Sequence, residues 1–183
     1  LTVLGAAAGD AGQYRAVVSN SAGTATSTAA TLTVTANRPP AASIALPAGL
    51  TNGKFVAGQT VTFAGTAPDP EDGTLGAAAY TWKVEYLSST ATGTPAVRPF
   101  VPEFGGATGG TFTPATSGPY TLTDVAYRVT LTVRDSAGLT TTTSTDVLPN
   151  VATVTLASAP AGLTLTLDGQ PYTAPTTFQS VVG

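Results

Sequence analysis

The chain has 183 residues, of which 42% are hydrophobic and only 9% charged, so it can bury a core and is not a disordered chain. Its net charge is −3 and its seven basic residues are scattered, which excludes nucleic acid as an expected partner. Because it has no cysteine and no histidine, disulfides, Ser-His-Asp or Cys-His catalysis and ordinary zinc sites are excluded. No apolar run approaches the roughly 20 residues of a membrane span.

Segments in which apolar residues alternate with threonine recur along the whole chain. This period of two is typical of strands with one buried face, and turn signals with glycine separate the segments. The sequence therefore predicts an all-β protein made of tandem β-sandwiches, with no helix longer than a turn or two. In chain order, the clearest alternating segments are residues 29–35, 59–63, 127–133 and 163–167.

Two proline-containing stretches indicate boundaries between modules. One is Asn37-Arg38-Pro39-Pro40 and the other is Leu148-Pro149-Asn150. Prolines remove backbone donors and stiffen the chain, as is common between domains. We therefore expect a first piece at residues 1–36, a linker at 37–40, a central domain at 41–148 and a last piece at 149–183.

The first piece contains a tyrosine motif. The run Asp10-Ala11-Gly12-Gln13-Tyr14-Arg15-Ala16 resembles the D-x-G-x-Y-x-C corner of immunoglobulin domains, with Ala16 in place of the cysteine. In that family the tyrosine hydroxyl bonds back to the backbone. The resemblance covers about residues 1–35 and implies only the carboxyl-terminal half of a sandwich. We expect upstream strands of a longer parent protein, or another chain, to complete it.

The central piece resembles a polycystic-kidney-disease (PKD) domain. The matching features are Asp69-Pro70-Glu71-Asp72-Gly73, a following strand with Trp82, and a strand that ends in Val133-Arg134-Asp135-Ser136-Ala137-Gly138. This resemblance implies a seven-stranded sandwich over residues 40–148. It is closest to the version appended to secreted sugar-dehydrogenase-like and polysaccharide-active bacterial proteins. That version often carries a histidine-containing segment after the Trp strand, which residues 87–104 lack.

The last piece resembles the start of a PEGA-like β-domain. The resemblance is carried by residues 160–170, which end in Leu167-Asp168-Gly169-Gln170, and by residues 174–178. It implies a strand, a tight Asp-Gly turn and a second strand. We expect this terminal module to be incomplete, like the first one.

Four acidic residues form the first candidate site: Asp69, Glu71, Asp72 and Asp135. In the fold that the PKD resemblance implies, their two loops lie at the same end of the sandwich. Four converging carboxylates would suit Ca²⁺, which takes six to eight oxygen ligands. The alternative is that these acids cap turns by accepting hydrogen bonds from nearby backbone N–H groups. Apart from Ca²⁺, no cofactor is expected.

The aromatic residues form the second candidate site. Trp82 is expected in the core, and Tyr80 and Tyr86 share its face of the strand. The alternative is that these rings form a platform for sugars. Phe100 and Phe104 lie in the Gly/Pro-rich segment 92–110, which is expected to be a loop. There they either form a binding edge or fold back over the sandwich, so Tyr86, Phe100 and Phe104 are the candidate ligand-binding residues.

These features together favour a non-enzymatic role outside a bacterial cell. The modules are expected to be spacer or interaction domains of a larger secreted or cell-surface protein, with the neighbouring domains of that chain as partners. The alternative is a carbohydrate-binding module that recognises a polysaccharide or cell-surface glycan. Missing catalytic groups and low charge motivate the first reading, and the aromatic residues motivate the second.

Overall fold

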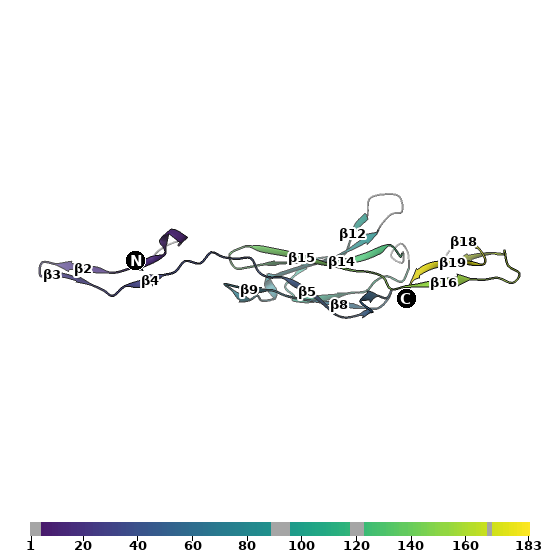
Figure 1. Ribbon diagram of the computed structural model, residues 1–183, viewed down its shortest axis with the longest axis horizontal. Coiled ribbons are helices and arrows are strands. Elements are labelled where there is room, and N and C mark those ends of the chain that lie inside the picture. Colours follow the sequence, from purple (N-terminus) through teal and green to yellow (C-terminus); the bar gives the residue numbers. More distant parts are fainter. Residues whose placement is uncertain (1–4, 89–95, 118–122, 168–169) are drawn as a thin grey trace. The chain divides into compact units, whose positions relative to one another are not determined.

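The computed structural model describes residues 5–88, 96–117, 123–167 and 170–183, in which strands are the dominant element (Figure 1). Helical structure in these ranges is limited to two 3₁₀ turns, η1 (Ala8–Asp10) and η2 (Ala77–Ala79). The predicted all-β class is therefore confirmed. None of the helical elements in these ranges is long and apolar enough to cross a membrane. The chain divides into two compact units, Leu1–Arg38 and Pro39–Gly183.

The first unit consists of two small antiparallel strand pairs. The hydroxyl of Tyr14 donates a hydrogen bond of 2.6 Å to the carbonyl oxygen of Asp10, which is the bond expected at this corner. No residue that the structure describes in this unit is buried, so the four strands have no core of their own. The pairs are β1 (Gly12–Tyr14) with β4 (Ala30–Leu32), and β2 (Val17–Asn20) with β3 (Gly23–Thr26).

The second unit is built on a sandwich of two antiparallel sheets (Figure 1). One sheet has the strand order β12-β11-β14-β15 and the other has the order β13-β8-β5, which gives the seven strands that were expected. Their bounds are β5 (Ser43–Ala48), β8 (Val61–Thr66), β11 (Tyr80–Ser88), β12 (Ala96–Gly105), β13 (Gly109–Phe112), β14 (Val125–Arg134) and β15 (Thr140–Val147).

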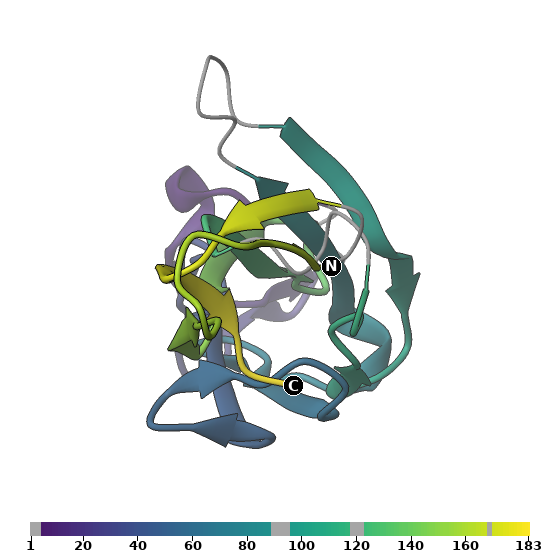
Figure 2. The same cartoon turned by 90° about the vertical axis from the view of Figure 1, so that its right-hand side faces the viewer.

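Residues 96–110, the described part of the segment predicted as a loop at 92–110, are largely strand, which corrects that prediction over this part. β12 pairs with β11 as an edge strand, and the chain then passes to the other sheet as β13. In the end-on view β12 is the teal ribbon that leads from one sheet toward the other (Figure 2). Pro99 and Pro102 concealed the strand, because proline is rare inside a sheet but tolerated at its edge.

The core lies between the two sheets and is filled from alternate residues of β11 and β14. Trp82 is fully buried, and its indole N–H donates a hydrogen bond of 2.9 Å to the carbonyl oxygen of Ala107. Its ring lies 4.9 Å from that of Phe63, between centroids. The predicted core position of Trp82 is confirmed. On β11, Tyr80, Val84 and Tyr86 share its inward face and are buried as well.

The remaining strands form short pairs around and beyond the sandwich. Asp168 and Gly169, the predicted turn of the last module, lie outside the described residues. The pairs are β6 (Leu50–Thr51) with β7 (Lys54–Phe55), β9 (Pro68–Asp69) with β10 (Gly73–Thr74), β16 (Val151–Leu156) with β19 (Thr176–Val181), and β17 (Thr164–Leu167) with β18 (Gln170–Thr173).

Backbone hydrogen bonds join the C-terminal strands to the sandwich. Phe55 donates its N–H to Leu148 at 2.9 Å and accepts from Asn150 at 2.8 Å. The N–H of Val182 bonds Asn150, and the N–H of Ala57 bonds Val182, both at 2.8 Å. The stretch around Pro149, expected to be a boundary, is therefore held on both sides. We call these four bonds the C-terminal joint.

Candidate functional site

The first acidic residue shapes its own loop. Asp69 is the last residue of β9, and its Oδ1 accepts hydrogen bonds from the backbone N–H groups of Glu71 at 2.9 Å and Asp72 at 2.7 Å. An aspartate that bonds the backbone two and three residues ahead fixes a tight turn. This turn leads directly into β10, so the carboxylate sets the direction in which Asp72 points.

Asp72 in turn fastens its loop to the loop that joins β14 and β15. Its Oδ2 accepts the backbone N–H of Ser136 and its Oδ1 accepts the Ser136 hydroxyl, both at 2.8 Å. Within the second loop, Oδ1 of Asp135 accepts the N–H of Leu139 at 2.8 Å. The two loops therefore lie together, as the PKD resemblance implied. We call the contact between Asp72 and Ser136 the loop clasp.

The carboxylates are arranged as turn caps rather than as a metal cage. In the described ranges, no group of three or more acidic side chains is close enough to hold a metal ion. One oxygen, Oδ2 of Asp69, is buried without a hydrogen-bond partner. The oxygens of Asp72 and the other oxygen of Asp69 already accept hydrogen bonds. This geometry favours the capping role, and calcium binding stays a prediction.

The three candidate ligand-binding aromatics pack against the core. Tyr86 is 2% exposed, and its ring lies edge-on to Tyr127 at 5.6 Å between centroids. The ring of Phe100 lies 4.7 Å from that of Tyr127, and the ring of Phe104 lies 6.4 Å from that of Phe63. Phe100 and Phe104 thus fold over the sandwich. Tyr86 offers no open ring face to a ligand, so this placement does not support an aromatic sugar platform.

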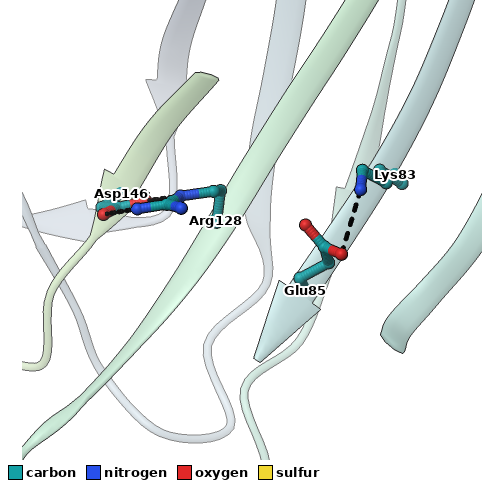
Figure 3. A network of polar contacts seen from close by, with 4 residues as sticks. All are labelled: Lys83, Glu85, Arg128 and Asp146. Carbon is teal, nitrogen blue, oxygen red and sulfur yellow. Dashed lines mark hydrogen bonds and ion pairs between the residues drawn. The ribbon is translucent and has the colours of Figure 1, made fainter. Parts of the chain in front are cut away.

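Charged side chains form an ordered row on the outer face of the four-stranded sheet. Glu85, Arg128 and Asp146 are directly opposite one another on β11, β14 and β15. Arg128 bonds Asp146 through Nε–Oδ1 at 2.7 Å and Nη2–Oδ2 at 2.8 Å, and Lys83 pairs with Glu85 at 3.0 Å (Figure 3). The hydrogen bonds from Arg128 lower the pKa of Asp146, and those to Asp146 raise the pKa of Arg128. The sequence analysis did not identify this row. Each of the three residues lies at an outward position of a strand whose residues alternate between the two faces of the sheet.

Threonine hydroxyls continue this face beside the charged row. Thr81, Thr132 and Thr142 are opposite one another on the same three strands, and the hydroxyls of Thr132 and Thr142 lie 2.9 Å apart. Cross-strand threonine pairs of this kind stabilise a sheet. The face is therefore an array of paired charges and hydroxyls, suited to contact with water or a polar surface.

A surface depression of about 400 Å³ lies beside the C-terminal joint. Its lining includes one basic and one acidic side chain, Lys54 and Asp124, together with the apolar Leu87, Leu148 and Val151. These residues come from separate segments, so no sequence motif pointed to them.

Comparisons of the chain with family models, curated proteins and solved structures found no match.

Proposed function

We propose that this chain is a non-catalytic spacer and interaction segment of a larger bacterial protein that is secreted or displayed at the cell surface. Its β-sandwich would hold neighbouring domains at a fixed separation. The observation that carries the proposal is the C-terminal joint, in which Phe55, Ala57, Asn150 and Val182 link two sets of strands through the backbone. A spacer needs such stiffness, because flexible linkers do not fix distance.

The surface chemistry also supports this proposal. Two acids, Asp72 and Asp146, are bonded to Ser136 and Arg128 at the loop clasp and in the outer charged row. Among the described residues the surface depression is lined by a single acid, Asp124, whereas a paired-carboxylate hydrolase needs two. The exposed strands are rich in threonine and carry few charges, as in many secreted β-proteins. Polysaccharide binding is not favoured, because Tyr86, Phe100 and Phe104 pack on the core.

Backbone ¹⁵N relaxation of the full chain tests the proposal. We expect residues 151–167 and 170–183 to tumble with the same correlation time as β11 and β14. Ala57→Pro removes the N–H that bonds Val182, and the C-terminal strands should then move faster. The matched control is Ala77→Pro at the first position of η2, where proline is tolerated.

Independent tumbling of the C-terminal strands in the unsubstituted chain would contradict a stiff spacer, whatever Ala57→Pro does. Reproducible retention on an insoluble polysaccharide would favour the carbohydrate-binding alternative instead. Turnover of a sugar polymer by the purified chain would show that the segment is an enzyme.

A further inference from the structure

The open edges of the sandwich differ in how well they are protected from other strands. β12 and β15 bound one sheet, and β13 and β5 bound the other. β12 carries two prolines and two register shifts, and β5 carries Pro47 and one register shift. β13 has only four residues, of which the first two are glycine. Proline, irregular register and short length are the means by which edges avoid unwanted pairing.

β15 has none of these protections. It runs for eight residues without proline, lysine or arginine, and it pairs with β14 in unbroken register from Thr140 to Val147. Along its other side, no residue in the described part of the chain hydrogen-bonds to the backbone of Thr140–Val147. The parallel bridge between Phe55 and Pro149 lies beyond its end. β15 is therefore a long and regular edge made of strand-favouring threonines. Its outer backbone groups have no hydrogen-bond partner within the described residues, and β5 of the other sheet lies near it.

The charges at the two ends of this edge are complementary. Asp146 lies near one end of β15, facing outward. At the other end, the exposed Arg134 of β14 lies opposite Thr140 and makes no ion pair within the described residues. An antiparallel neighbour of the same sequence would bring each Asp146 toward the Arg134 end of the other copy. A carboxylate has lone pairs for a second donor, so its bonds to Arg128 do not prevent this contact.

We propose that β15 pairs antiparallel with β15 of a second copy of this chain, about a two-fold axis at Thr143. Opposite residues must share a face of the sheet, which restricts the possible registers. An axis at Thr143 places Asp146 opposite Thr140 of the second copy. In that copy, Arg134 lies on β14 directly beside Thr140. An axis at Ser144 places Asp146 opposite Thr142, away from Arg134, so the charges favour Thr143 over Ser144. The product is one continuous sheet with four strands from each copy. This pairing does not depend on the spacer role.

Disulfide trapping tests the proposed register. The chain has no cysteine, so Thr143→Cys introduces a single thiol. At the axis the two Cys residues face each other with Cα atoms about 4.5–5.5 Å apart, within disulfide range. In the control Thr142→Cys the two thiols are diagonal neighbours about 7–8 Å apart, beyond that range. We expect mild oxidation to cross-link Thr143→Cys several-fold faster. Equal rates, or faster cross-linking of the control, would overturn the register.

Charge variants test the pairing itself by sedimentation equilibrium. The unsubstituted chain should approach twice the mass of one chain as its concentration rises. Thr143→Lys and Thr143→Glu each place like charges directly opposite at the axis and should stay monomeric. An equal mixture of the two should recover dimers, which a folding defect would not allow. The proposal is overturned if the unsubstituted chain stays monomeric, if the single variants associate as it does, or if the mixture recovers nothing. Circular dichroism checks that each variant is folded. If a charge variant unfolds, the cross-linking rates of Thr143→Cys and Thr142→Cys test the pairing instead.

Discussion

Arg128 and Asp146 meet through two parallel hydrogen bonds across β14 and β15, at 2.7 and 2.8 Å. Their side chains are 42% and 37% exposed, so water screens the attraction between them. Exposed pairs of this kind contribute at most about 1 kcal/mol to the free energy of unfolding. The bidentate geometry makes this pair the best defined charge contact on the outer face.

The lowered pKa of Asp146 predicts how this contribution depends on pH. A carboxyl whose pKa falls on folding stabilises the fold above its ordinary value of 3.8, and the gain is lost as pH drops through the folded value. Arg128→Met should therefore lower the unfolding free energy at neutral pH by less than about 1 kcal/mol. The difference from the unsubstituted chain should shrink in strong acid. Urea denaturation across pH measures it.

The control for this prediction is Arg98→Met, which removes one exposed cation that has no ion pair within the described residues and leaves the pair of Arg128 and Asp146 intact. Its acid dependence should match that of the unsubstituted chain. If Arg128→Met keeps the same deficit at every pH, the pair is not the source of the effect.

Gly65 predicts a steric effect in the core. A Cβ at this position would lie 2.8 Å from Cδ2 of Leu131 and 2.8 Å from Cζ2 of Trp82, closer than real Cβ contacts. Gly65→Ala should therefore destabilise the fold by about 1–3 kcal/mol, the usual cost of overpacking. Gly76→Ala is the matched control, because nothing lies within 4 Å of its added carbon. Equal melting temperatures for the two variants would contradict the packing of Trp82 against β8.

Period-two alternation predicted several strands, such as the segment 127–133 that lies within β14. The sandwich that the PKD resemblance implies placed Trp82 in the core, and period-two alternation then placed Tyr80 and Tyr86 on the same inward face. Alternation could not reveal β12, where Pro99 and Pro102 interrupt the pattern of an edge strand. It also could not predict the C-terminal joint. The bonds of Phe55 and Val182 involve only backbone atoms, which are the same for almost every residue type. The loop clasp was predicted in part. The PKD resemblance implied that the two loops lie at the same end of the sandwich, but nothing in the sequence indicated that Ser136 bonds Asp72.

The loop clasp predicts graded losses of stability. Asp72→Ala removes both acceptors for Ser136 and should lower the unfolding free energy by about 1 kcal/mol or more, as expected for hydrogen bonds to a charged group. Ser136→Ala removes only the hydroxyl donor and leaves the backbone bond, so its loss should be smaller. Chemical denaturation of the two variants measures the order. A larger loss for Ser136→Ala would mean that Asp72 does not hold the second loop.

The same geometry predicts a weak response to calcium. Because Asp69 and Asp72 already accept hydrogen bonds from Glu71, Asp72 and Ser136, the melting temperature should be the same with excess Ca²⁺ as with EDTA. A ligand that binds only the folded state would raise it. A rise that disappears in Asp69→Asn would contradict the capping role and support the calcium site predicted from the sequence.

Amide hydrogen exchange at the C-terminal joint tests the central claim most directly. If the sandwich and the C-terminal strands form one stiff segment, the amides of Ala57, Asn150 and Val182 should exchange as slowly as those of β11 and β14, because all open only with the fold. Exchange of these three amides at the rate of the exposed strand amides of Val17 and Val18, while β11 stays protected, would show that the joint opens freely. The segment would then be a flexible tether and not a spacer.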